Sequence, residues 1–353
     1  MTKKEKIISG VALAVLAVAV VVLVVVLLMN RGSVKPKQRV YFNYFDTVSV
    51  VYCYAIESDG EFDEKCKAVS ELLSEYHKLS DIYNDYGELN NLKKLNDSAG
   101  EGPIQIDEKL MDMLLYAKKM HELTDGRVNV AMGAVLKIWH EYRTEGLKSP
   151  SAAELPPMAL LEDAAQHCDI DSLVLDTDAM TAQITDPKTS LDMGAIAKGY
   201  ATERAAELLV ALGADGYALD IGSNLRMIGE NPSGDGWSIK IRNPSPSEQN
   251  RYADELTVDS GAVVTSGNYE RFYTVGGVRY HHIINEKTLM PSEYFASVTV
   301  IHPDSGFADA MSTALFNCSY EDALAIIDKA RSDGYGDIKA VFITSSGEKL
   351  YSR

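Results

Sequence analysis

Cysteine is scarce in this sequence of 353 residues, and the four that occur lie far apart. They are Cys53, Cys66, Cys168 and Cys318, and no two of them form a Cys-x-x-Cys pair. A disulfide framework and a thiolate zinc site both need cysteines at close, regular spacing. The sequence therefore predicts neither. Cys66 and Cys318 lie in segments with apolar periodicity and are expected to be small core residues.

Positive charge is also in short supply, with 34 Lys and Arg against 51 Asp and Glu and a formal net charge of -17. The bases gather at the front, where residues 1–39 hold seven bases and one acid, so the remainder has a net charge of -23. Such an acidic body repels a polyanion, and nucleic-acid binding is not expected. A phosphorylated ligand would need local help from a metal, a helix N-terminus or a few placed bases.

Several catalytic motifs are missing. No Gly-x-Gly-x-x-Gly opens a helix after a strand, and there is no Walker A sequence and no Gly-x-Ser-x-Gly elbow. His140-Glu141 is not followed by the second His of a zinc-binding His-Glu-x-x-His helix. Strands and helices are predicted to intermix without strict alternation, so a Rossmann sheet is not favoured and the fold class is predicted to be α+β.

One long apolar run is present, the 23 residues from Ile7 to Met29. At ~1.5 Å per residue it spans the ~30 Å hydrocarbon core of a bilayer. A cleaved signal peptide has a shorter apolar region and a small-x-small cleavage site, which is missing here. We expect an uncleaved single-pass transmembrane anchor over residues 7–29. The short basic segment 1–6 is expected to stay in the cytoplasm, which places the body outside the cell membrane.

The remainder is predicted to be a basic linker over residues 30–40 and one continuous domain over residues 41–353. Apolar residues at helical spacing predict helices over residues 62–79, 107–126, 159–168 and 196–212, after Asp309 and from Ser319. Alternating and β-branched runs predict strands at residues 45–56, 172–175, 182–184, 217–221, 237–241, 263–265, 279–284, 296–301 and 339–344.

The segment 190–200 turns through Gly194 into a helix that carries Lys198 near its start. Free backbone N–H groups at a helix start attract anions, and a cation placed there opposes the helix dipole unless an anion lies nearby. Two interpretations of this segment are about equally favoured. In one, Lys198 lies near an anionic ligand; in the other, Lys198 is solvated and Asp192 is an ordinary cap.

The segment 308–316 places Asp309 and Thr313 at i and i+4, on one face of a helix. A carboxylate and a hydroxyl, with backbone and phosphate oxygens, suit Mg²⁺. Taken alone, the pair is more often an N-cap and an ordinary helix residue.

The segment 279–285 carries His281 and His282 side by side in a predicted strand. Neighbours in a strand point to opposite faces, so only one of them can reach a given pocket. A neutral His near a hydroxyl is a natural general base, although a His satisfied by backbone bonds in a core is the commoner case.

These segments occur in order with others along the chain. The motifs at residues 192–200, 220–224, 265–271, 281–284 and 308–314 are joined by Phe45-Asp46-Thr47, by residues 79–83 leading to Asn96, and by residues 126–139. Over residues 41–350 this series resembles the ApbE family of FAD:protein FMN transferases. The resemblance implies a single T-fold-like α+β domain.

The resemblance also implies a reaction that needs Mg²⁺. FAD is split at its pyrophosphate, AMP leaves, and FMN is joined through its phosphate to a threonine hydroxyl of a target flavoprotein. Asp309 and Thr313 would hold Mg²⁺ with the backbone oxygen of Ala195, and His282 fits the position of the base. Flavin-nucleotide contacts are implied for Phe45, Tyr83, Ala131, Met132, Gly133, Asp192, Lys198 and Ile284.

The chain departs from the family pattern at three places. Residues 284–289 stand where Ile-Asp-Pro-x-Thr-Gly is common, Ser223 stands where a second Gly is common, and residues 129–131 replace a usual Asp-x-Thr. Two other functions remain open from the residues. The same scaffold could hydrolyse FAD to FMN and AMP, or it could bind flavin without catalysis at the membrane.

Overall fold

The computed structural model describes residues 36–247 and 250–352. The predicted anchor over residues 7–29 lies outside these ranges. Within them, no helix is both long enough and apolar enough to cross a bilayer.

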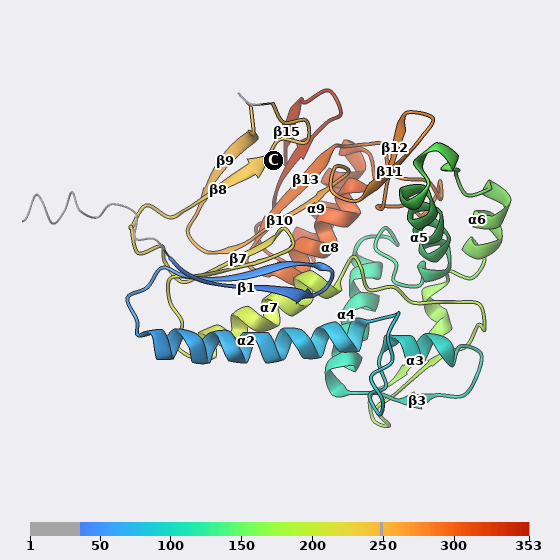
Figure 1. The fold of residues 1–353 in the computed structure, drawn as a ribbon, viewed down its shortest axis with the longest axis horizontal. Coiled ribbons are helices and arrows are strands. Elements are labelled where there is room, and N and C mark those ends of the chain that lie inside the picture. Colours follow the sequence, from blue (N-terminus) through green and yellow to red (C-terminus); the bar gives the residue numbers. More distant parts are fainter. Residues whose placement is uncertain (1–35, 248–249, 353) are drawn as a thin grey trace, which may run out of the picture.

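An eight-stranded antiparallel sheet forms the centre of the domain, in the order β1-β2-β6-β7-β10-β13-β14-β15 (Figure 1). Its strands are β1 (Lys37–Tyr44), β2 (Thr47–Cys53), β6 (Tyr217–Ile221), β7 (Asn224–Ile228), β10 (Gly261–Gly267), β13 (Ser297–His302), β14 (Lys339–Ile343) and β15 (Lys349–Tyr351).

The two faces of this sheet are covered differently. The helices α2 (Asp59–Ser80), α7 (Ala197–Ala211) and α8 (Ser305–Phe316) pack on one face and share the main hydrophobic core with it. The hairpin of β8 (Trp237–Arg242) and β9 (Tyr252–Val258) covers part of the other face, where Trp237 packs on Met227 and Val263. Two further helices pack against this layer, α4 (Glu108–Leu123) against α2 and α9 (Tyr320–Ser332) against α8.

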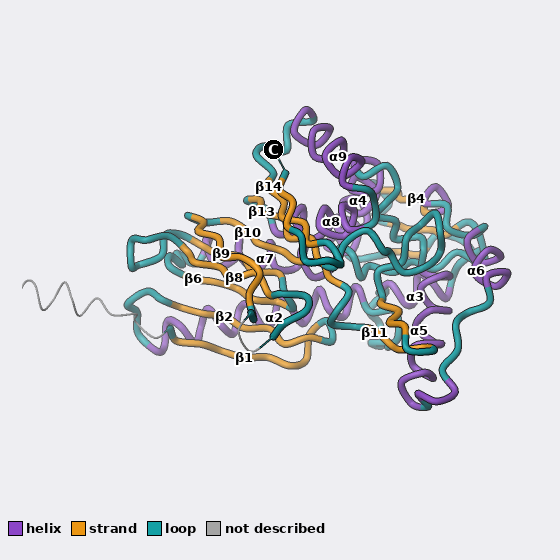
Figure 2. Tube along the Cα trace, turned by 90° about the horizontal axis from the view of Figure 1, so that it is seen from above, coloured by secondary structure: helices purple, strands orange, loops and turns teal. Residues whose placement is uncertain are grey.

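A second, smaller core lies beside the end of the sheet where the β1–β2 turn is found (Figures 1 and 2). It joins α5 (Gly133–Lys148) and α6 (Met158–Ala165) to the hairpin of β11 (Phe272–Val275) and β12 (Val278–His281) around Trp139. The remaining elements are α3 (Leu92–Asp97), the small sheet of β3 (Ile104–Gln105), β5 (Thr181–Ile184) and β4 (Leu173–Asp176), and 3-10 turns at Pro150–Ala152 and Ile170–Ser172.

Helices with a clear apolar stripe and a capping residue form as predicted. In α2 the buried residues repeat at helical spacing, and Ser58 with Glu61 forms a capping box at its start. Asp107 caps α4, and the Ser319 side chain accepts a hydrogen bond from Asp322 N at the start of α9. The chain leaves α7 through Gly213, whose φ of 73° is the left-handed conformation expected of a C-terminal stop.

Three predicted elements need correction. The strand predicted over residues 45–56 is shorter, β2 at Thr47–Cys53, because Phe45 and Asp46, with φ values of 52° and 50°, make the tight turn between β1 and β2. The strand β1 begins at Lys37, inside the range assigned to the linker. The helix expected after Asp309 begins earlier, at Ser305, because the Asp304 side chain accepts a hydrogen bond from Phe307 N and caps it.

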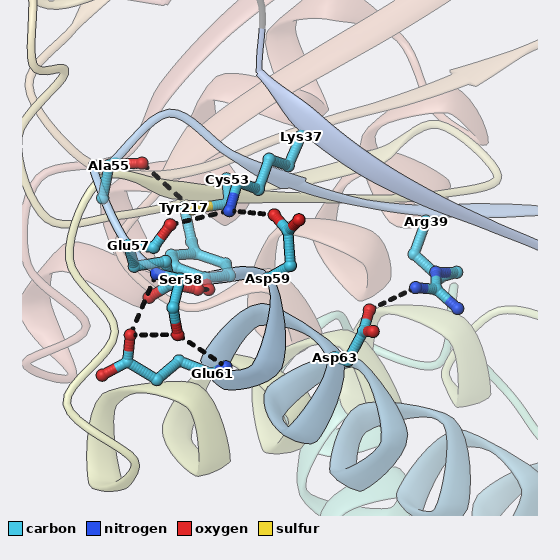
Figure 3. Close-up of polar contacts among 10 residues, drawn as sticks. All are labelled: Lys37, Arg39, Cys53, Ala55, Glu57, Ser58, Asp59, Glu61, Asp63 and Tyr217. Atoms are coloured by element: carbon cyan, nitrogen blue, oxygen red, sulfur yellow. Dashed lines mark hydrogen bonds and ion pairs between the residues drawn. The ribbon is translucent and has the colours of Figure 1, made fainter.

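Polar contacts fasten the start of β1 to the start of α2 (Figure 3). Lys37 Nζ donates to Glu57 O at 2.7 Å and to Asp59 Oδ1 at 2.6 Å, and Arg39 pairs with Asp63. The Tyr217 hydroxyl on β6 donates to the Glu57 carboxylate. The first described strand is thus tied to both the sheet and the helix layer at the end of the hairpin opposite the β1–β2 turn.

Candidate active site

A cleft of about 960 Å³ lies between the second core around α5 and the end of the sheet where the β1–β2 turn is found. The β1–β2 turn, the β6–β7 turn, the end of β10 and the segment after β12 contribute lining residues. Opposite them stand α5, residues 190–198 and α8. Segments far apart in the sequence therefore meet here, as the ordered series of motifs predicts.

The segment before α7 is fixed from two sides. The Asn96 side chain pairs with the Leu191 backbone, donating to its O at 2.9 Å and accepting from its N at 2.7 Å. A Cβ on Gly133 would stand 2.3 Å from Ser190 O, so only glycine allows α5 to begin this close to the segment. Asp192 then turns the chain by accepting a hydrogen bond from Gly194 N at 2.7 Å.

The start of α7 holds a carboxylate from the protein itself. Gly199 N, in the first turn, donates to Asp309 Oδ2 at 2.7 Å, and Lys198 Nζ lies 3.9 Å from the same oxygen. The anion favoured at a helix N-terminus is therefore supplied in part by Asp309. A phosphate in the cleft would meet the ammonium of Lys198 rather than a bare helix end.

Asp309 and Thr313 lie on α8 at the floor of the cleft. Burial raises the pKa of Asp309, while Lys198, the Gly199 N–H and the Asn224 amide oppose that rise. The hydroxyl of Thr313 lies 3.4 Å from Ser266 Oγ of β10, which makes its shorter bond, of 2.7 Å, with Ser312 Oγ. The carboxylate and the hydroxyl thus reach the cleft from one helix face, as predicted.

The two histidines face different surroundings, although the strand predicted over residues 279–284 ends at His281 and His282 lies just beyond it. His281 is buried, its Nε2–H donates to Ser292 O at 2.8 Å, and its Nδ1 accepts from Ile283 N. His282 opens into the cleft, and its Nδ1 lies 3.2 Å from Arg271 O. Because a carbonyl oxygen only accepts, Nδ1 must carry the proton, which leaves the Nε2 lone pair free. Burial among cleft atoms lowers the pKa of His282, and the positive charge of Arg271 lowers it further.

The loop after α2 presents Tyr83 to the cleft. Asp81 organises it, accepting from Tyr83 N at 2.7 Å and from the Tyr86 hydroxyl at 2.6 Å. The Tyr83 ring remains 58% exposed and lies 5.6 Å from the His140 ring of α5, centroid to centroid. An aromatic surface is thus available for a flat ligand.

The departures from the family pattern keep a turn geometry. Asn285 Oδ1 accepts from Lys287 N and Thr288 N at 3.0 Å each, the turn that an Asp would make, and its Nδ2 donates to Asn317 O. Leu289 and Ser223 replace glycines at φ values of 58° and 75°, a region that favours glycine. Both residues therefore carry local backbone strain.

We expect Ser223→Gly to stabilise the protein by about 0.5–1 kcal/mol. Relief of a left-handed non-glycine residue is worth roughly 1–2 kcal/mol, and the extra freedom of an unfolded glycine takes back roughly half of it. Urea unfolding measures the change. Ser245→Gly is the control, because Ser245 is exposed and has no positive φ; an equal gain there, or a loss at Ser223, would contradict the strain.

The cleft brings together most residues with a predicted role, although their roles remain predictions. His282, Tyr83, Met132, Gly133, Asp192, Lys198, Ile284, Ala195, Asp309 and Thr313 all line it. Two do not: Ala131 is fully buried, and Phe45 packs edge-on against His77 while the next residue, Asp46, faces the cleft.

Sequence reasoning assigned no role to four further polar residues of the cleft. Arg143 and His140 stand one turn apart on α5, which was not predicted as a helix, and their side chains lie 3.1 Å apart. Arg271 donates to Asp46 O at 3.0 Å and so ties the β1–β2 turn to the segment before β11. Asn224 is buried, and its Oδ1 has no hydrogen-bond donor within the described ranges.

The chain matches the family model described as the ApbE family over residues 45–337. It is 34% identical over 251 residues to the FAD:protein FMN transferase of Treponema pallidum, covering 67% of each chain. It is 28% identical over 334 residues to the FAD:protein FMN transferase of Haemophilus influenzae, covering 92% of this chain and 91% of that relative.

Solved structures have the same fold. The ApbE protein of Thermotoga maritima superposes with a TM-score of 0.77 at 25% identity, covering 90% of this chain and 97% of its own. The flavin transferase ApbE of Vibrio cholerae gives a TM-score of 0.70 at 23% identity over the same shares, which speaks for the fold alone.

Proposed function

This chain belongs to the ApbE family and is a FAD:protein FMN transferase, and we propose that the transfer needs Mg²⁺ and ends on a threonine hydroxyl of a target flavoprotein. The observation that carries this proposal is the convergence in one cleft of a buried carboxylate, a hydroxyl, an ammonium and a histidine with a free Nε2. These groups come from α7, α8 and the segment after β12.

The residues present fit a hard divalent cation. Asp309 is a buried carboxylate, and Lys198 Nζ lies 3.9 Å from it. The side-chain amide of Asn224 also lies against Asp309, and its buried Oδ1 has no donor within the described ranges. Within those ranges no three His, Cys, Asp or Glu side chains gather as a metal cage. Mg²⁺ is ordinarily held by one or two carboxylates together with substrate phosphates, so one carboxylate with Thr313 and the Ala195 oxygen is sufficient.

The side chains of this cleft have distinct tasks in the transfer. When bound, Mg²⁺ would stabilise the charge that develops on the pyrophosphate oxygens. Lys198 neutralises part of the same charge, and Tyr83 offers its ring to the flavin nucleotide. His282 Nε2 accepts the proton of the threonine hydroxyl. The threonine oxygen bonds to the FMN phosphorus, and the bond between that phosphorus and AMP breaks.

The test uses the full chain in detergent with FAD and Mg²⁺, and membranes from a strain that lacks this protein as the source of acceptors. Transfer gives AMP in solution and a fluorescent protein band that survives denaturing electrophoresis. AMP with only free FMN would instead indicate hydrolysis. FAD binding without AMP release would indicate a flavin-binding protein and contradict the proposal.

We further propose that residues 7–29 anchor the enzyme in the cell membrane with the catalytic domain outside the cytoplasm. The support is the 23-residue apolar run behind a short basic N-terminus. An acceptor flavoprotein outside the cytoplasm would gain from covalent attachment, because its flavin cannot then diffuse away.

Protease added to intact protoplasts should therefore digest the catalytic domain completely, because it is expected on the outer face. Immunoblotting with an antibody to the C-terminal region follows the loss, and a cytoplasmic protein serves as the control for lysis. Full protection of the domain until detergent is added would rule out this orientation.

A further inference from the structure

We propose that Glu203 is a positioning residue of the active site, which fixes the helix that carries Asp309 and Thr313 against the helix that carries Lys198. Glu203 lies on α7, one turn after Gly199, and does not line the cleft. It acts through α8. The proposal rests on the role assigned above to Asp309.

Each of the two helices places a carboxylate at the start of the other. Gly199 N, on α7, donates to Asp309 Oδ2 at 2.7 Å, and Ser305 N, on α8, donates to Glu203 Oε2 at 2.7 Å. Gly199 and Glu203 are four residues apart, as are Ser305 and Asp309, so the two contacts lie one turn apart along an antiparallel pair. Each helix thus satisfies an N–H group of the other that has no partner within its own helix.

The Glu203 carboxylate is itself held in place by the sheet. Arg226 of β7 donates to it through Nε at 2.8 Å and through Nη2 at 2.9 Å, a bidentate pair. The side chains are 8% and 16% exposed, and Arg226 Nη1 also donates to Met227 O. The start of α8 is therefore fixed relative to both α7 and the central sheet.

The two helices pack in close contact at the carboxylate of Asp309. A Cβ on Gly199 would stand 2.3 Å from Asp309 Cβ and 2.6 Å from Ser305 O. A small sliding of α8 would consequently move Asp309 away from Gly199 N and Lys198. Glu203 prevents that movement one turn from the point where the geometry matters.

The test is Glu203→Gln in the full chain, with Mn²⁺ as a probe of the Mg²⁺ site because both prefer oxygen ligands. Loss of a direct hydrogen-bond partner of a metal ligand typically weakens metal binding by 10–100-fold. Glu203 acts on Asp309 only through the start of α8, so we expect the Mn²⁺ dissociation constant to rise about tenfold, the lower end of that range. The dissociation constant for FAD without metal should change less than about twofold, since no cleft group is removed. Amide exchange over residues 305–316 should accelerate without metal.

Glu57→Gln is the matched control. Glu57 forms another buried pair, with Lys65 Nζ at 2.7 Å and side chains 12% and 13% exposed, and it also accepts the Tyr217 hydroxyl (Figure 3). It lies at the other end of β2 from the cleft, roughly 20 Å along the strand. This variant should lose stability but leave Mn²⁺ binding and exchange in α8 unchanged.

The outcomes separate this inference from the metal assignment. If exchange over residues 305–316 in Glu203→Gln matches that in Glu57→Gln, Glu203 is merely structural and the inference is overturned, whatever Mn²⁺ does. If Asp309→Asn leaves Mn²⁺ binding intact, the metal assignment fails, while faster exchange in Glu203→Gln still supports the positioning role. Should Glu203→Gln not fold, Arg226→Lys, which keeps the charge but loses the bidentate geometry, should give the same changes to a smaller extent.

Discussion

Replacing Asp309 by asparagine should abolish Mg²⁺-dependent release of AMP from FAD while the protein still folds. A metal contributes several kcal/mol to transition-state stabilisation, and about 4 kcal/mol corresponds to roughly a thousandfold in rate. Asparagine keeps an oxygen for Gly199 N, the one backbone donor recorded for this side chain within the described ranges. We therefore expect a loss of activity far larger than any loss of stability.

Asp304→Asn is the control for this variant, because it makes the same change on the same helix outside the cleft. Asp304 caps α8 by accepting from Phe307 N at 2.9 Å, and asparagine caps helices as well as aspartate does. Single-turnover assays with FAD, together with urea unfolding of both variants, test the difference. Activity in Asp309→Asn within tenfold of the unchanged enzyme would refute the metal role, and equal activity losses in both variants would point to a general weakening of α8.

Local patterns in the sequence predicted those parts of the fold that depend on local physics. The stripe of α2, the caps at Asp107 and Ser319 and the glycine stop after α7 all follow from spacing and from hydrogen bonds within one turn. The helix α5 was missed, although its face toward the second core carries Val135 and Trp139. Its partners in that core, such as Tyr273 and Leu289, come from a distant part of the chain.

The active site likewise has residues that local motifs predict and contacts that they do not. Motif order placed Asp309, Lys198 and His282 in one cleft, because these residues belong to short ordered segments. The bond between Glu203 and Ser305 N joins residues about a hundred apart, and no local pattern distinguishes Glu203 from other acids on a helix. Asp309 was expected near the helix start, yet the cap that sets this start is Asp304, a local signal within one turn that the sequence interpretation missed.

The second large effect is expected at His282. His282→Gln should reduce the single-turnover rate of FMN transfer by roughly 10²–10⁴, the usual consequence of losing a general base. The affinity for FAD should change little, because the proton moves only during the reaction. His281→Gln is the matched control: it disturbs the bonds to Ser292 O and from Ile283 N, so it should lower the free energy of unfolding and leave the transfer rate nearly unchanged.

The lowered pKa of His282 sets the direction of the pH dependence. Its folded pKa lies below the ordinary 6.5, so the capacity of the imidazole to accept a proton falls less between pH 8 and pH 6 than that of an ordinary histidine. The unfolded chain binds this proton more readily, so the His282 contribution lowers stability only as the pH falls below about 6.5.

NMR titration of the His282 Cε1–H signal, assigned with His282→Gln, measures the pKa directly. In Arg271→Gln the pKa should rise, because the positive charge that lowers it most is removed. A normal pKa in the unchanged protein would contradict the effect assigned to burial and Arg271. Equal rate losses in the two histidine variants would mean that another group takes the proton.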